Sequence, residues 1–227
     1  MSGQGEEIST LFKVFLSYSS KDRVIARKIK RGLNTFGVAT FLAHDDLTPT
    51  VEWEEEILCA LRECDAFLPI LTENYPTSSW TDQEVGVAVG LKKVVLPISV
   101  GINPYGFIAR YQAIRLRDSD VTHDFCGLAV DALMKNTRLG AQIRQGIINS
   151  FVESNSFTDA AEKAANLLRI KHLDPDELQI ILEAASTNNQ IYQSFRAQNS
   201  IATIISRYKS KIDPRLARRF RVAAGFI

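Results

Sequence analysis

The chain has 227 residues, enough for one large domain or two small ones with a real hydrophobic core. Hydrophobic residues make up 45% and charged residues 23%, a composition of globular proteins rather than of disordered or fibrous ones. No apolar run reaches the roughly 18 residues of a membrane span, and the polar, acidic residues 1–10 do not resemble a secretory signal, so we expect a cytoplasmic protein with a short disordered lead-in.

The chain is predicted to contain five strands, at residues 12–16, 38–42, 66–71, 94–100 and 113–116. Helical periodicity lies between and after them, at residues 22–36, 53–62, 80–91 and 125–134. Short apolar strands that alternate with amphipathic helices indicate a parallel sheet covered on both faces. The predicted fold class is therefore α/β, a doubly wound parallel sheet of five strands.

The pattern changes after this region, where only helices are predicted. Asp174 and Pro175 form a helix start, with Asp174 as the cap and Pro175 in the first turn, and Asp213 with Pro214 repeats the signal. Charge changes as well, from a net −4 over residues 1–136 to a net +5 over the remainder. We therefore predict two modules, an α/β domain at residues 11–136 and a small all-α domain at residues 137–227.

The cysteines and the basic C-terminal end receive the simpler interpretation. Cys59, Cys64 and Cys126 have no metal-type pairing, so we expect reduced thiols that are buried or half-buried, and no metal site. The arginines between residues 215 and 221 are interleaved with few aromatic residues, so we expect a solvated helix face and no nucleic-acid site.

Four ordered motifs within residues 12–116 carry a resemblance to a known family. They are VFLSYSSKD at 14–22, FLAHDDL at 41–47, CDAFLPIL at 64–71 and SWTDQEVG at 79–86. Together they resemble the Toll/interleukin-1 receptor (TIR) domain family, specifically bacterial TIR-domain proteins. The resemblance implies a flavodoxin-like fold, as the periodicity also predicts.

The resemblance implies one of two functional classes. Some members are adaptors that only associate, and others cleave NAD+ at the bond between nicotinamide and ribose. The enzymes of the family carry a Trp and a Glu four residues apart on the third helix, which here are Trp80 and Glu84. The implied setting is bacterial anti-phage defence or cell-death signalling, with a homo-oligomer formed through the 43–52 loop and a trigger or partner protein at the C-terminal helices.

The chemistry explains why a carboxylate is needed. Cleavage of an N-glycosidic bond passes through a cationic, oxocarbenium-like ribose, which a carboxylate beside the anomeric carbon stabilises. Nicotinamide leaves readily from a cation, so one carboxylate, Glu84, can suffice with no metal and no second acid. The resemblance implies NAD+ as the substrate, and we expect no cofactor. Ser79 and Asp82 resemble a capping box that would fix the start of this helix.

The remaining candidate residues lie at strand ends, which gather on one edge of a parallel sheet. The predicted substrate-binding residues are Ser17, Tyr18, His44, Asp45, Asp46 and Trp80. Each candidate also has a structural interpretation. Glu84 is then a solvated helix residue, Trp80 a lid on the core, and Ser17 and Tyr18 the end of a strand, while His44 is a solvated loop residue and Asp45 and Asp46 shape the turn. Two other functions remain open, an adaptor or a protein that interferes with host signalling, and a transferase of ADP-ribose or a deoxyribosyl group.

Overall fold

The computed structural model describes residues 11–42, 53–117 and 121–226. Its strands are β1 (Lys13–Ser17), β2 (Ala39–Leu42), β3 (Ala66–Leu71), β4 (Val94–Val95), β5 (Ile98–Ser99) and β6 (Ile114–Arg115). They pair in the order β2-β1-β3-β5-β6, with β4 also beside β3, and all of these pairings are parallel. The flavodoxin-like, doubly wound sheet predicted from the sequence is confirmed.

The number of strands differs from the prediction. The single strand expected at residues 94–100 is divided into β4 and β5 by Leu96 and Pro97, so the sheet has six strands instead of five. Proline has no backbone N–H and cannot donate to a neighbouring strand. Both short strands pair with β3, so they stay in one sheet. The carbonyl group of Pro97 accepts from the backbone N–H of Ile114 in β6, at 2.9 Å.

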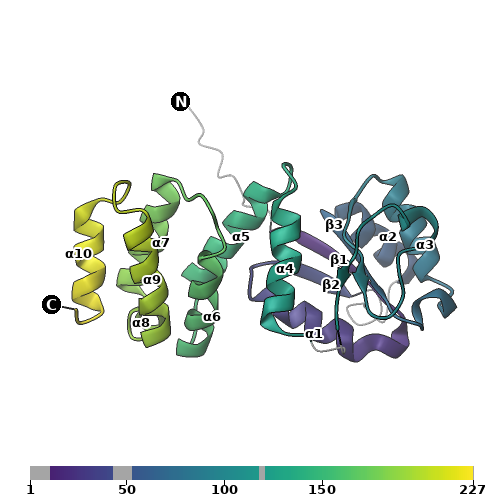
Figure 1. Ribbon diagram of the computed structural model, residues 1–227, viewed down its shortest axis with the longest axis horizontal. Helices are drawn as coiled ribbons and strands as arrows, with labels where there is room; N and C mark the ends of the chain where they lie inside the picture. Colours follow the sequence, from purple (N-terminus) through teal and green to yellow (C-terminus); the bar gives the residue numbers. More distant parts are fainter. Residues whose placement is uncertain (1–10, 43–52, 118–120, 227) are drawn as a thin grey trace.

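Helices cover both faces of this sheet (Figure 1). They are α1 (Arg23–Asn34), α2 (Trp53–Glu63), α3 (Thr81–Gly90) and α4 (His123–Met134). Alternate residues of β1 serve the two faces: Val14 and Leu16 belong to the core under α1 and α4, and Phe15 to the core under α2 and α3. The sequence prediction therefore placed each of these helices within two residues of its ends.

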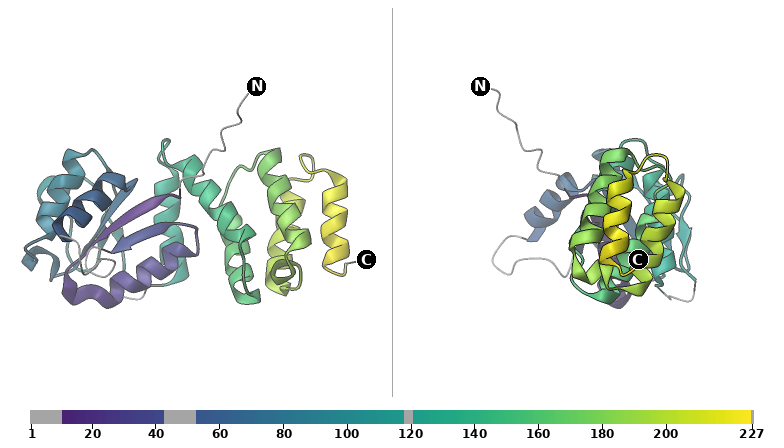
Figure 2. Two further views of the ribbon diagram at one scale, coloured as in Figure 1. Left: turned by 180° about the vertical axis from the view of Figure 1, so that it is seen from behind. Right: turned by 90° about the vertical axis from the view of Figure 1, so that its left-hand side faces the viewer.

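The rest of the chain is a stack of helices that extends away from the sheet, with α10 as the outermost helix (Figures 1 and 2). The helices are α5 (Gly140–Val152), α6 (Phe157–Leu167), α7 (Pro175–Thr187), α8 (Asn189–Tyr192), α9 (Phe195–Arg207) and α10 (Pro214–Ala223). The predicted helix start at Asp174 is confirmed as a full capping box with Glu177. Glu177 also accepts from the Arg144 side chain at 2.6 Å, which ties α5 to α7.

The stack joins the sheet on the α1 and α4 side through close backbone contact. Gly37, just after α1, has φ +70°, and a Cβ atom there would overlap the carbonyl group of Gly146 in α5. Only glycine combines this backbone conformation with so close an approach. One hydrophobic cluster accordingly continues from Leu16 in β1 to Phe220 in α10.

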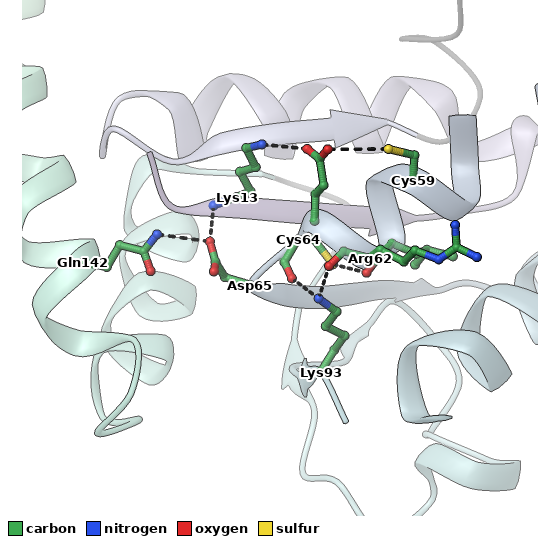
Figure 3. A network of polar contacts seen from close by, with 9 residues as sticks. Lys13, Cys59, Arg62, Cys64, Asp65, Lys93 and Gln142 are labelled. Carbon is green, nitrogen blue, oxygen red and sulfur yellow. Dashed lines mark hydrogen bonds and ion pairs between the residues drawn. The ribbon is translucent and has the colours of Figure 1, made fainter. Parts of the chain in front are cut away.

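A polar network at the amino ends of β1 and β3 adds a second connection (Figure 3). Asp65 accepts from the backbone N–H of Lys13 at 2.8 Å and from the side chain of Gln142 in α5 at 3.3 Å. Cys59 donates to Glu63 on the outside of α2 and is exposed, so its predicted burial is wrong, while Cys64 and Cys126 are buried as predicted. No helix of the described residues is long and apolar enough to span a bilayer.

Candidate active site

The carboxyl ends of β1 and β3 lie side by side, because these two strands are direct neighbours. The chain moves from β1 to β2 on one side and to β3 on the other, so the strand order reverses here. Sheets of this class bind ligands at such a reversal. Asp22, after β1, accepts from Thr72 at 2.5 Å and from Asn74 at 2.9 Å, which holds together the loops that follow the two strands.

The start of α3 is fixed differently from the prediction. Its first helical residue is Thr81 and its N-cap is Trp80, with no side-chain cap, so the predicted Ser79 capping box is wrong. Ser79 lies one residue too early to cap. Asp82 instead accepts from the Tyr105 hydroxyl at 2.7 Å. The Thr81 hydroxyl donates to the carbonyl group of Tyr75 at 2.8 Å and anchors the helix start to the loop after β3.

Glu84 lies in the first turn of α3 with its carboxyl group against the end of β1. Its side chain is 2% exposed, and Oε2 accepts a hydrogen bond of 2.5 Å from the hydroxyl group of Ser17. The Ser17 oxygen is also 2.7 Å from the Tyr75 hydroxyl. Ser17 has one proton and gives it to Glu84, so Tyr75 donates to Ser17. Oε1 of Glu84 has no hydrogen-bond partner among the described residues.

Burial dominates the protonation of this carboxyl group. It raises the pKa of Glu84 from an ordinary value of 4.5 to about 7, and the hydrogen bond from Ser17 acts in the opposite direction. Burial also raises the pKa of the Tyr75 phenol well above 10, so this group stays protonated and remains a donor. A carboxyl group that titrates near neutral pH, at the ligand-binding edge of the sheet, is typical of a functional site.

The predicted site residues separate into three groups. Ser17 and Glu84 are in direct contact. Trp80 is half-buried, and its backbone carbonyl group accepts from the backbone N–H of Glu84 at 2.9 Å. Tyr18 is fully buried in the core of the opposite face, under α1 and α4, because successive residues of a strand alternate between faces. The third group, His44, Asp45 and Asp46, lies outside the described residues.

Tyr75 is the residue that the sequence analysis missed. It lies in a short 3-10 turn after β3 and is fully buried. Its position directly after a predicted strand was a usable signal, since loops at that edge gather around the site. The described residues contain no group of three or more His, Cys, Asp or Glu side chains able to hold a metal ion.

Fold and site together define a flavodoxin-like α/β protein with a buried carboxyl group beside the strand-order reversal. The family model of the TIR domain matches residues 14–129, and the chain belongs to the TIR domain family. A curated relative from Brachypodium distachyon, "Probable 2' cyclic ADP-D-ribose synthase BdTIR", is 29% identical over 106 residues. That match covers 46% of this chain and 46% of the relative, so the chain spans about half the length of the relative.

Two solved structures are similar in fold at low identity. The TIR domain of a Toll-related receptor from Hydra magnipapillata is 20% identical, with a TM-score of 0.41, over 48% of this chain and 86% of that chain. The TIR domains of the activated Roq1 resistosome are 18% identical, with a TM-score of 0.39, over 60% of this chain and 80% of that chain.

Proposed function

We propose that this chain cleaves NAD+ at the bond between nicotinamide and ribose, with Glu84 as the carboxylate that faces the anomeric carbon. The observation that carries the proposal is the buried Glu84 carboxyl group, held by Ser17 at the edge where sheets of this class bind ligands. The name of the Brachypodium relative, a probable cyclic ADP-ribose synthase, gives the same substrate class. NAD+ is the substrate here, and the proposal requires neither a metal nor a cofactor.

The main task of the protein in this reaction is to stabilise the positive charge that forms on the ribose. The bond between C1 of the ribose and the ring nitrogen breaks, and neutral nicotinamide leaves with the electron pair. The remaining ribose carries positive charge, which the Glu84 carboxylate stabilises strongly in a site that excludes water. Attack of water on C1, with loss of a proton, gives ADP-ribose, and attack by a hydroxyl group of the same nucleotide gives a cyclic product.

The hydrogen-bond chain assigns a role to two neighbours of Glu84. The Ser17 hydroxyl group stabilises the charged carboxylate and fixes Oε2, which leaves Oε1 available to the substrate. Tyr75 donates to Ser17 and thereby orients the Ser17 proton toward Glu84. Both act through Glu84 as positioning residues. Because the active form is the carboxylate, kcat/KM should rise with pH through about 7 and then level off.

The burial of Glu84 gives a reason to expect regulation. At 2% exposed, the side chain is reached by a substrate only after neighbouring groups move. We therefore propose that self-association through TIR–TIR contacts, including the 43–52 loop outside the described residues, produces the active conformation. The setting we propose is the bacterial cytoplasm, in anti-phage defence or cell-death signalling. His44, Asp45 and Asp46 remain proposed substrate contacts.

The direct test is nicotinamide release from NAD+ by the full chain at several protein concentrations, followed by liquid chromatography. Glu84→Gln should lower the rate by about 100-fold or more, the usual cost of losing one group that stabilises charge in a transition state. Glu183→Gln makes the same chemical change at an exposed helix position and should leave the rate unchanged. Equal rates for wild type and Glu84→Gln would refute the role of Glu84.

The same experiment separates the alternative functions. No turnover at any concentration, also after forced dimerisation of the full chain, would favour an adaptor or an interfering protein. Turnover that needs an acceptor, with ADP-ribose or a deoxyribosyl group found on that acceptor, would indicate a transferase. Identification of the products by mass spectrometry distinguishes hydrolysis from cyclisation.

A further inference from the structure

The helical stack is built as two rows. In the first row α5 packs against α7 and α7 against α10, and in the second row α6 packs against α9. Among the described residues the first row therefore has one helix more than the second. The right-hand view of Figure 2 looks onto this end of the stack, with α10 (yellow) in front and α9 (yellow-green) beside it. The outer side of α9, next to α10, is the position of a further helix in the second row.

This position is a groove of about 600 Å³. Its lining comes from α9, the connecting turn, α10 and the residues after α10, and includes Ala202, Ile205, Lys209, Ile212, Arg218 and Arg221. Ile205 and Ile212, each 8% exposed, and Phe220, 1% exposed, belong to the hydrophobic core of the stack and form the apolar floor of the groove. Phe226, which also lines the groove, is 50% exposed.

The rim of the groove is basic. Lys209, Arg218 and Arg221 line it and are exposed, and no described carboxylate forms an ion pair with any of the three. Residues 189–227 contain eight Lys and Arg but a single acidic residue, Asp213. Asp213 is occupied as the cap of α10, where it accepts from a backbone N–H. The positive charge at this end of the stack is therefore not balanced within the described part of the chain.

We propose that this groove binds an amphipathic helix of a partner protein, with an apolar stripe flanked by Asp or Glu side chains. The stripe packs over Ile205, Ile212 and the exposed ring of Phe226. The carboxylates meet Lys209, Arg218 and Arg221. A helix laid in an apolar groove is a common mode of protein recognition. The partner helix lies against α9 in the second row, as α10 lies against α7 in the first row. Its packing is therefore the same kind of helix–helix packing that builds the rest of the stack.

The shape and the charge pattern favour this occupant over two others. A nucleic acid needs a basic track with several exposed aromatic side chains that stack on its bases, whereas Phe220 is 1% exposed here and Phe226 is the one exposed aromatic residue of the lining as described. A membrane surface needs a protruding apolar face, whereas this surface is concave. The described helices of a second copy fit poorly as well, since each leaves at most one large apolar side chain exposed, such as Leu128 on α4 or Phe195 on α9, and offers no apolar stripe.

The test measures binding of the full chain to a fluorescein-labelled synthetic helix of about 18 residues, a length at which an isolated helix begins to be stable. The first peptide has a leucine stripe flanked by glutamates. A second peptide carries lysines in place of the glutamates, and a third has the first composition in scrambled order. Fluorescence anisotropy should give the acidic amphipathic peptide an affinity at least about tenfold higher than either of the others, and the affinity should fall as salt is added.

Variants of the chain locate the binding site. The pair Arg218→Glu and Arg221→Glu should weaken binding of the acidic peptide at least about tenfold. The matched pair Arg215→Glu and Arg219→Glu makes the same charge change on α10 outside the groove and should change the affinity less than about threefold. Ala202→Trp, which fills the groove without a change of charge, should also weaken binding strongly.

Three results would overturn the proposal. The first is equal binding of the acidic and the scrambled peptide, or equal effects of the two double variants. The second is binding of single-stranded DNA or of phosphatidylserine vesicles that is tighter than that of the peptide and sensitive to Arg218→Glu with Arg221→Glu. The third is a dimer, seen by light scattering, that the same double variant dissociates, since this would make a second copy the occupant.

Discussion

Replacement of Glu84 by Gln should change how the stability of the protein depends on pH. Gln has the shape of a protonated Glu but stays neutral at every pH. The native state holds the Glu84 proton up to about pH 7, because the carboxyl group is buried, whereas the unfolded chain releases it near pH 4.5. Between these values the native state binds one more proton than the unfolded state, so the stability of the wild type falls as pH rises.

The size of the effect follows from the pKa. A rise from 4.5 to about 7 corresponds to about 3 kcal/mol, since one pKa unit is worth about 1.36 kcal/mol. Most of this, about 2.5 kcal/mol, falls between pH 5 and pH 8. The Glu84→Gln variant does not lose this stability as pH rises. The free energy of unfolding of the variant minus that of the wild type should therefore increase by about 2.5 kcal/mol from pH 5 to pH 8. For a chain of this size the gain equals a relative rise in Tm of roughly 5–10 °C.

Thermal and urea unfolding of both proteins, at pH 5 and at pH 8, measure this difference. The quantity compared is the gap between the two proteins, that is, the difference between their free energies of unfolding, at each pH. Contributions of other titrating groups are the same in both proteins and cancel, and a pH-independent cost of the amide does not change the gap. Glu183→Gln, at an exposed position, should keep a constant gap to the wild type. A gap for Glu84→Gln that changes by less than about 0.5 kcal/mol, or in the opposite direction, would show that Glu84 is not a desolvated carboxyl group.

Two further variants test the contacts around the site and the stack. Ser17→Ala removes a hydrogen bond that lowers the pKa of Glu84, so the rise of kcat/KM with pH should move up by about one pH unit, a shift that simple damage to the fold would not produce. Gly37→Ala should cost about 2–5 kcal/mol of stability, from backbone strain at φ +70° and overlap with Gly146, measured by urea unfolding. The control is Gly106→Ala, where φ is +55° and the space is open, so only the strain of about 1–2 kcal/mol is expected, and an equal loss for both variants would contradict a close contact at Gly37.

The sequence predicted those parts of the fold that local patterns determine. Hydrophobic periodicity identified the parallel sheet and its helices, because burial on two faces leaves a recognisable order of apolar residues. The cap at Asp174 was predictable, since Asp followed by Pro is a local signal for a helix start, whereas the reciprocal bond from Glu177 was not predicted. Pro97 was also a local signal, for the division of the predicted fourth strand into β4 and β5. The prediction missed this division because the residues around Pro97 are a continuous apolar run. The boundary between residues 136 and 137 stays a prediction.

The site itself depends on contacts between residues far apart in the chain. Ser17 and Glu84 are separated by 67 positions, and only the pairing of β1 with β3 and the position of α3 bring them within 2.5 Å. The same contact explains why Tyr75 was missed, since its role depends on the position of Ser17. The prediction of Tyr18 as a site residue was wrong for a simpler reason. Tyr18 follows Ser17 directly, and neighbouring residues of a strand point to opposite faces of the sheet.

The two faces of the sheet also separate the proposed catalytic and binding functions. Glu84 lies on the side of α2 and α3, whereas the helical stack continues the core under α1 and α4. The proposed groove lies at the far end of that stack, next to α10 (Figure 1). A partner in the groove therefore has no continuous side-chain packing on one face through which to affect Glu84. Its effect would cross the sheet through strands that have side chains in both cores, such as β1, which carries Ser17, or β3, which leads to Tyr75. The alternative is that the partner brings two copies of the chain together, as the proposed activation by self-association requires.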